Sequence, residues 1–171
     1  MGEISRRPTQ TNADILLGRV GPIKNAIASR VHCSMEINDI TYAVNGSVFE
    51  VNKVLGPGFL EKVYENALLI ELKRRGLTAE SQVPIKVLYK ENVVGEFIAD
   101  ILVEGKIILE LKTVKTIDKI HEAQLLNYLK ATGIRVGILV NFKHPKAEIK
   151  RMVLDLPEGR QMQCLGRSSR H

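Results

Sequence analysis

The spacing of hydrophobic residues predicts two helices in the first half of the chain. From Glu36 onward, apolar residues recur every three or four positions, as on one face of an amphipathic helix. This stripe consists of Ile37, Ile40, Val44, Val48, Val51 and Leu55. Gly56-Pro57-Gly58 should end the helix, because glycine and proline supply a stop and a turn. A second helix is predicted over residues 60–75, with Gly76 as its C-terminal cap. Its apolar side should comprise Val63, Ala67 and Ile70.

Alternation of apolar and polar residues then predicts three strands. The first covers residues 81–89, and Glu91-Asn92 should connect it to a second strand at 93–103. The predicted buried face of the first strand consists of Val83, Ile85, Val87 and Tyr89. Residues 106–114 form the third strand, and the Glu104-Gly105 pair between the last two indicates a β-hairpin. The three strands should make an antiparallel meander.

The last third of the domain returns to a helix and then to strands. Residues 118–132 have helical spacing and should end at Gly133, and residues 134–141 have the pattern of a buried strand. Residues 148–154 fit either a short edge strand or a helix. Because a helix lies between strands, we expect an α/β fold, with a mixed β-sheet flanked by α-helices, in preference to an all-β sandwich.

Length and composition indicate one ordinary globular domain. The chain has 171 residues, of which 44% are hydrophobic and 26% charged, close to the average for soluble proteins. No apolar run approaches the roughly 18 residues that cross a bilayer, so a membrane protein is not expected. Cys33 and Cys164 are far apart and have no metal-ligand spacing. This favours a reducing compartment, and we expect a cytoplasmic protein.

The net charge of +6 is concentrated outside the predicted domain. Residues 1–35, interpreted as a disordered extension, contribute +3, and residues 156–171, interpreted as a flexible tail, contribute +2. The domain at 36–155 has 17 basic and 16 acidic residues. Bulk charge is therefore weak evidence for a nucleic-acid partner, and such a partner must be argued from particular residues.

Three ionisable residues interrupt the two hairpin strands. Glu110 and Lys112 project to the same side of their strand, because successive side chains alternate. Taken alone, they fit an exposed ion pair at a strand end. Asp100 lies inside an otherwise apolar strand, where a carboxylate is costly unless it binds a cation or accepts hydrogen bonds.

The length of the hairpin turn decides whether the two acids meet. A three-residue turn at 104–106 places Asp100 opposite Glu110, whereas a two-residue turn places it opposite Leu109. Opposed carboxylates are unfavourable without a cation between them. The three-residue register therefore predicts a site for a hard metal with oxygen ligands, with Mg²⁺ as the natural ion and Mn²⁺ as a substitute.

Three sequence elements in order resemble a known nuclease family. Asp100 followed by Glu110-Leu111-Lys112 resembles the D-x(n)-E-x-K signature of the PD-(D/E)XK nuclease superfamily. Gln124 and Tyr128 resemble the Q-x-x-x-Y element of its RecB-type exonuclease branch. The segment Gly58-Phe59-Leu60-Glu61-Lys62-Val63-Tyr64 matches the element that names the GxxExxY protein family. The resemblance covers about residues 36–154 and implies a restriction-endonuclease-like α/β fold.

The resemblance implies a metal site on the hairpin strands. Asp100 and Glu110 would bind Mg²⁺, and the carbonyl of Leu111 would be a further ligand. The metal would acidify the attacking water and polarise the phosphoryl oxygen. Lys112 would orient or activate this water and offset charge in the transition state.

The resemblance also implies roles for residues on two helices. Glu61 would complete the acidic cluster through water or a second ion, and Gln124 with Tyr128 would position the lysine, a water or the scissile phosphate. Residues of the matched segment also fit ordinary structural roles. Glu61 also fits a solvated acid at a helix start, and Tyr64 a core ring. His121 is expected to be a surface residue.

The expected function is metal-dependent hydrolysis of phosphodiester bonds in nucleic acid, with DNA as the expected form. Two alternatives stay open, namely a non-catalytic module that binds nucleic acid or protein, and a phosphodiesterase for small nucleotides. A basic cluster near the domain end either tracks a phosphate backbone or is a solvated face. It comprises Lys143, Lys146, Lys150 and Arg151. A homodimer or partner protein would enlarge the small substrate-binding surface.

Overall fold

Helices and strands follow one another along residues 35–155, the part of the chain that the computed structural model describes. In chain order they are α1 (Ile37–Leu55), α2 (Glu61–Arg74), β1 (Ala79–Tyr89), β2 (Asn92–Val103), β3 (Ile107–Lys112), α3 (Lys119–Thr132), β4 (Val136–Asn141) and β5 (Glu148–Val153). Except for Met35, the predicted extension and tail lie outside the described residues, as do both cysteines.

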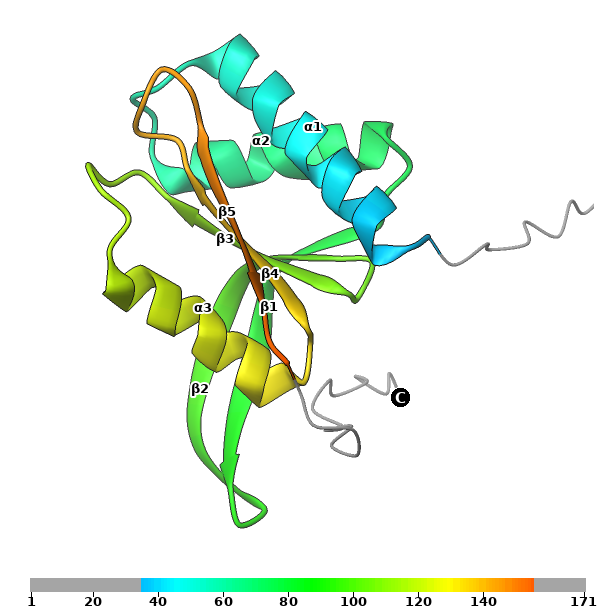
Figure 1. Ribbon diagram of the computed structural model, residues 1–171, viewed down its shortest axis with the longest axis vertical. Coiled ribbons are helices and arrows are strands. Elements are labelled where there is room, and N and C mark those ends of the chain that lie inside the picture. Colours follow the sequence, from blue (N-terminus) through cyan, green and yellow to red (C-terminus); the bar gives the residue numbers. More distant parts are fainter. Residues whose placement is uncertain (1–34, 156–171) are drawn as a thin grey trace, which may run out of the picture. The chain divides into compact units, whose positions relative to one another are not determined.

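One mixed sheet organises these elements. Its strand order is β1-β2-β3-β4-β5, with β3 and β4 parallel and all other neighbours antiparallel. The helices α1 and α2 lie on one face and α3 lies on the other (Figure 1). The prediction of a mixed sheet flanked by helices is confirmed. β5 is an edge strand, because residues 148–153 pair with β4.

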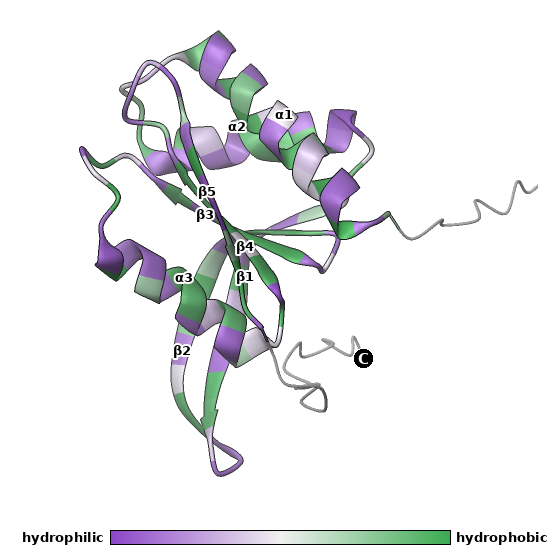
Figure 2. Ribbon diagram, viewed as in Figure 1, coloured by the Kyte–Doolittle hydropathy of each residue, from purple (hydrophilic) through white to green (hydrophobic). Residues whose placement is uncertain are grey.

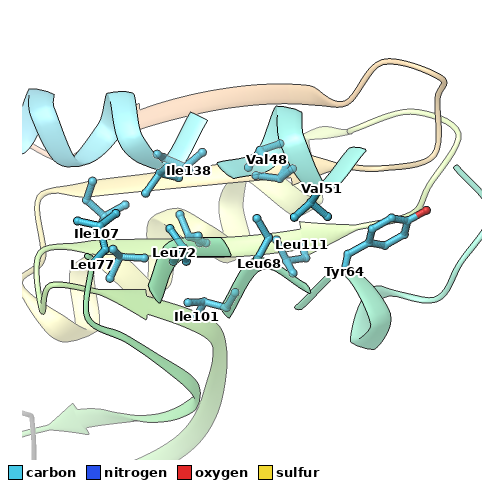
Figure 3. Close-up of a cluster of buried hydrophobic side chains, with 14 of the residues drawn as sticks. Val48, Val51, Tyr64, Leu68, Leu72, Leu77, Ile101, Ile107, Leu111 and Ile138 are labelled. Atoms are coloured by element: carbon cyan, nitrogen blue, oxygen red, sulfur yellow. The ribbon is translucent and has the colours of Figure 1, made fainter. Parts of the chain in front are cut away.

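Two hydrophobic clusters hold the layers together, one on each face of the sheet. Figure 3 shows the larger cluster, in which side chains of α1 and α2 meet those of β2, β3 and β4. The stripe predicted for α1 supplies Ile40, Val44, Val48 and Val51, all of them buried. Each such side chain contributes about 1.5–3 kcal/mol when it leaves water. Figure 2 shows hydrophobic residues on the helix surfaces that face the sheet.

The buried face of α2 differs from the predicted one. Val63 and Ile70 are exposed. The buried residues are Tyr64, Glu65, Leu68 and Leu72. The ring of Tyr64 stacks on Phe142, with centroids 4.3 Å apart and planes 2° from parallel. This contact with the segment after β4 fixes the rotation of the helix, and local spacing could not reveal it.

Glycines end all three described helices as predicted, and at the end of α1 the N–H of Gly56 donates to the carbonyl of Asn52 at 2.8 Å. Gly76 has a φ of 79°, which suits a residue without Cβ. The N–H of Leu77 donates to the carbonyl of Leu72 at 3.0 Å, the long hydrogen bond of a Schellman cap. Gly133 adopts the left-handed conformation after α3.

The hairpin of β1 and β2 departs from regular alternation near its tip. The turn is Lys90-Glu91, one residue earlier than predicted, and both residues have positive φ, of 47° and 68°. A β-bulge between Val87 and Leu88 shifts the register. Because of this shift, Tyr89 is exposed and does not share the buried face predicted for it.

The hairpin of β2 and β3 has the three-residue turn. Its pairs are Ile101 with Leu109, Leu102 with Ile108, and Val103 with Ile107. The N–H of Lys106 donates to the carbonyl of Val103 at 2.9 Å and closes the turn. The next positions in this register are Asp100 and Glu110. Of the two registers that the sequence allowed, the structure has the one that brings the acids together.

Candidate active site

Asp100 and Glu110 form an acid pair where β2 and β3 separate. One Asp100 oxygen, Oδ2, accepts a hydrogen bond from the N–H of Leu111 at 2.7 Å. Burial raises the pKa of Asp100, although this hydrogen bond and the charge of Lys112 act in the opposite direction. Burial and then the charge of Asp100 raise the pKa of Glu110 to about 7. Because the charge of Asp100 acts on Glu110, the two carboxyl groups lie close together.

The side chain of Glu110 has one satisfied oxygen and one unsatisfied oxygen. Oε1 accepts a hydrogen bond from Lys112 Nζ at 2.8 Å. Oε2 is buried and has no hydrogen-bond partner among residues 35–155. Glu110 is only 2% exposed. An unpaired oxygen at this depth destabilises the fold unless a cation or a water molecule binds to it.

Lys112 remains a cation in this environment. Burial by itself lowers its pKa, but the hydrogen bond and charge of Glu110, together with the other acids, outweigh burial and raise it. A lysine with a raised pKa is fully protonated at neutral pH. Lys112 can therefore donate hydrogen bonds and offer positive charge, but in this state it cannot accept a proton.

An irregularity in the backbone of β2 sets the side of the sheet to which the Asp100 side chain points. Ala99 belongs to the cluster under α3, whereas Ile101 belongs to the cluster under α1 and α2. Residues two apart in a regular strand share a face, so β2 changes face at Asp100. Opposite it in β1, Gln82 has a φ of 54° and no ladder partner. Such strained residues concentrate at functional sites.

Glu61 lies at the start of α2 and faces the acid pair from outside. Its Oε1 accepts hydrogen bonds from Thr113, at 3.0 Å from the backbone N–H and 3.1 Å from Oγ1. Its negative charge adds to the raised pKa values of Asp100 and Glu110. Within residues 35–155, however, no three acidic, histidine or cysteine side chains converge on one point. Glu61 therefore lies near the two acids but does not form a three-residue metal-binding group with them.

Glu65 is a buried acid that the sequence reasoning missed. Its Oε1 lies 2.6 Å from Lys62 Nζ, and its Oε2 accepts from Gln82 Nε2 at 2.8 Å. Its charge also acts on Asp100. The residue follows Glu61 by one helical turn, and this spacing was the available signal. Glu65 links α2 to the irregular position of β1.

Gln124 and Tyr128 come together on α3. Gln124 Nε2 donates to the hydroxyl of Tyr128 at 2.7 Å, across one helical turn. Burial raises the pKa of Tyr128, and the negative charge of Glu110 raises it further. The tyrosine therefore faces the acid pair, and α3 brings this predicted pair to the same side of the sheet as Glu110.

Asn141, another residue that the sequence reasoning missed, holds the chain after β3. It is fully buried at the end of β4. Its Nδ2 donates to the carbonyl of Val114 at 2.8 Å, and its Oδ1 accepts from the N–H of Val114 at 3.1 Å. The N–H of Phe142 also donates to the carbonyl of Lys112 at 2.9 Å. These contacts fix the backbone beside Lys112, and only the parallel pairing of β3 and β4 brings them together.

Tyr64 is part of the core, as one of the two interpretations predicted. Its hydroxyl donates to the carbonyl of Gly56 at 2.7 Å and accepts from the N–H of Phe59 at 3.3 Å. The tyrosine therefore secures the loop that leads into Glu61.

Replacing Tyr64 with phenylalanine should lower the free energy of unfolding by about 1 kcal/mol, because two part-buried hydrogen bonds to the backbone are lost. Urea denaturation measures this change. Tyr42→Phe, at an exposed tyrosine, is the control and should be neutral. Equal stability of both variants would show that the Tyr64 hydroxyl does not hold the loop.

The predicted basic cluster does not form one surface. Lys150 Nζ pairs with Glu122 of α3 at 2.8 Å. Arg151 is the next residue of β5 and therefore projects to the other face of the sheet. Lys143 and Lys146 lie in the loop before β5. Because strand alternation divides the cluster, it does not provide a continuous track for a phosphate backbone.

His121 has a structural role in the first turn of α3. Its Nδ1 accepts a hydrogen bond from the N–H of Asp118, and the Asp118 side chain accepts from the N–H of His121, both at 3.2 Å. This reciprocal pair is a capping box. The histidine is half-buried and was expected on the surface.

Comparison with known proteins identifies the family. The model of a family described as "PD-(D/E)XK nuclease superfamily" matches residues 38–152. The chain belongs to the PD-(D/E)XK nuclease superfamily. The match includes the acid pair, Lys112 and all three helices except the first residue of α1.

Other comparisons add little to this assignment to the PD-(D/E)XK superfamily. A solved structure titled "Crystal structure of SSO0001" is similar at 22% identity and a TM-score of 0.46, over 71% of this chain. The match spans 64% of that protein's chain. No curated protein matches the sequence. Within residues 35–155, no helix is long and apolar enough to span a bilayer.

The donor set at the acid pair fits the divalent metals that PD-(D/E)XK nucleases typically use. The unpaired Oε2 of Glu110 and the carboxylate of Asp100 are hard oxygen donors. In an extended strand, the N–H and C=O of one residue point to the same neighbour. The Leu111 N–H points to Asp100, so its carbonyl also points toward β2. Two carboxylates and a carbonyl suit Mg²⁺, which retains several waters, better than Zn²⁺, which prefers histidine and cysteine.

Proposed function

We propose that this protein is a Mg²⁺-dependent nuclease that hydrolyses phosphodiester bonds, with DNA as the substrate. The observation that carries the proposal is the buried, unpaired oxygen of Glu110 beside a second carboxylate. A polypeptide tolerates this arrangement when a cation neutralises it. The superfamily assignment supports phosphodiester hydrolysis as the reaction class.

In this proposal, Asp100, Glu110 and the carbonyl of Leu111 hold the ion. When bound, Mg²⁺ supplies Lewis-acid chemistry, because it acidifies water and polarises a phosphoryl oxygen. The hydrogen bond from the Leu111 N–H holds one Asp100 oxygen in place, which keeps the carboxylate oriented before the ion arrives.

Lys112 has an electrostatic role in the proposed mechanism. Its raised pKa keeps it protonated, so it orients the attacking water or a phosphate oxygen by donating a hydrogen bond. It also offsets the negative charge that grows on the phosphoryl oxygens in the transition state. Because the Lys112 amine is protonated, it does not act as the base that takes a proton from the attacking water.

Residues from both helical layers position the reacting groups. Gln124 and Tyr128 act as a hydrogen-bonded pair that orients Lys112, a water or the scissile phosphate. Glu61 contributes through water or a second ion. The bond between Gln124 and Tyr128 supports membership of the RecB-type branch, and the position of the 58–64 segment beside the site supports the GxxExxY family.

Digestion of single- and double-stranded DNA and RNA tests the proposal. The full chain is incubated with Mg²⁺, with Mn²⁺ and with excess chelator. We expect cleavage of DNA that requires metal and is lost in Asp100→Asn. Glu148→Gln, at an exposed acid of β5, is the matched control and should retain activity.

The proposal fails if the wild type has no metal-dependent activity above Asp100→Asn on any of these substrates. Calorimetric titration with Mg²⁺ then identifies the alternative. A non-catalytic module that retains only the fold would give no heat that depends on Glu110. Cleavage confined to small nucleotides would instead indicate the phosphodiesterase alternative.

A further inference from the structure

The outer part of the β1–β2 hairpin, residues 82–98, has a face that no helix covers. We call this part the distal hairpin, and Figure 1 shows it extending beyond α3. Its inner face, with Ile85, packs in the cluster under α3 together with the adjoining Ala99. On the outer face, Ile98 is 55% exposed and its partner Pro84 is also exposed. Val94, at the bulge, is exposed as well.

An opposite-charge pair lies next to these apolar residues. Lys86 and Glu96 are partners in the β1–β2 register and lie on the same outer face, next to Pro84 and Ile98. Both are exposed, and neither forms an ion pair with any residue of 35–155. The outer face therefore combines an apolar strip with one positive and one negative group, both available to a partner.

The charge of the distal hairpin disfavours nucleic acid and anionic membranes as its partner. Residues 82–98 contain two lysines and two glutamates, so they are neutral overall. Binding to phosphate-rich surfaces requires a cationic excess. Figure 2 shows hydrophobic stretches along this hairpin that alternate with hydrophilic ones. An apolar strip of this kind on a soluble domain indicates a protein partner.

We propose that this outer face is the interface of a homodimer with two-fold symmetry. A surface with one lysine and one glutamate is complementary to itself, because a two-fold axis places Lys86 against the partner's Glu96 and Glu96 against the partner's Lys86. Ile98, Pro84 and Val94 supply the apolar contact. The charge pairs fix the relative orientation of the two copies, and apolar burial provides most of the affinity. Pro84 lacks an N–H, which favours packing of faces over pairing of strand edges.

Sedimentation velocity of the full chain over a concentration series tests the dimer. We expect a concentration-dependent dimer, and Ile98→Asp should raise its Kd at least about tenfold. The matched control is Ile70→Asp on α2, where the isoleucine is similarly exposed at 63%, and it should dimerise as the wild type does. Circular dichroism verifies that both variants fold.

Charge reversal gives a test that folding defects cannot imitate. Lys86→Glu presents two negative groups and Glu96→Lys two positive groups, so each variant alone should be monomeric. An equimolar mixture of the two should restore the dimer. Loss of association in the single variants followed by recovery in the mixture is the expected result, because only a contact between copies produces it.

Three results on this protein alone would overturn the proposal. They are a monomeric wild type over the whole concentration range, a dimer that Ile98→Asp leaves unchanged, and a mixture of charge variants that stays monomeric. Stable association with a different protein through the same face, without self-association, would also overturn it. The nuclease assay is independent of this test, so either proposal can fail alone.

Discussion

Replacing Glu110 with glutamine is expected to stabilise the metal-free protein by about 3 kcal/mol above pH 7. The ionised carboxylate is unfavourable in the fold, because burial and the charge of Asp100 raise its pKa from 4.5 to about 7. Glutamine has the same shape and carries no charge. It can still accept the hydrogen bond from Lys112.

The sign of this effect follows from proton binding. As the pH rises through 4.5, the unfolded chain releases the Glu110 proton, whereas the folded chain retains it until about pH 7. The folded state binds more protons in this window, so the wild type loses stability as pH rises from 4.5 to 7. Below this window Glu110→Gln and wild type should be equally stable, and above it the difference should be constant.

Urea denaturation from about pH 4 to pH 9, with chelator present, measures the difference. Glu148→Gln on the surface of β5 is the control and should track the wild type. Added Mg²⁺ at high pH should stabilise the wild type but leave Glu110→Gln unchanged, because the ion requires the ionised carboxylate. A Glu110→Gln variant less stable than wild type at high pH would contradict the electrostatic account.

Replacing Lys112 with methionine should lower kcat by about 100- to 1000-fold, the usual effect of removing one electrostatic contact to the transition state. Methionine retains most of the length of the lysine side chain and removes its charge. Without this cation, the pKa of Glu110 should rise further, since Lys112 lowers it in the wild type. Metal binding at neutral pH would then weaken as a secondary effect.

Measurement at about pH 9 with saturating Mg²⁺ separates the two effects, because high pH and the bound ion both favour the ionised form of Glu110. Lys106→Met, at the exposed lysine before the other end of β3, is the matched control and should retain its rate. If Lys112→Met regained the full rate under these conditions, the lysine would serve only to keep Glu110 ionised.

Much of this fold could be predicted because local patterns and tertiary packing agree. The stripe of α1, the cap at Gly76 and the strands of the meander follow from spacing and turn residues alone. The buried face of α2 does not follow from spacing, because two different faces of this helix have apolar residues at helical intervals. The choice depends on Phe142, which is 78 positions after Tyr64 in the chain. No window along the helix contains that information.

In the candidate site, too, some residues could be recognised from the sequence and others could not. Asp100, Glu110 and Lys112 could be recognised because a charge inside an apolar strand is costly and draws attention. Asn141 could not, since an asparagine at a strand end is ordinary in sequence, and for Glu65 the only signal was its spacing of one helical turn from Glu61. Their importance arises from partners at Gln82 and Val114, which only the assembled sheet brings close.

The turn at residues 104–106 provides a rule for judging related sequences. Opposed residues in a hairpin with an odd-numbered turn are always separated by an odd number of residues, and nine lie between Asp100 and Glu110. A relative that keeps the three-residue turn but has eight or ten residues in this interval would retain every acidic residue and yet direct one of them away from the other, unless a bulge restored the phase. Among relatives with the same turn, the parity of this interval therefore separates those able to assemble such a centre from those that have only its residue types.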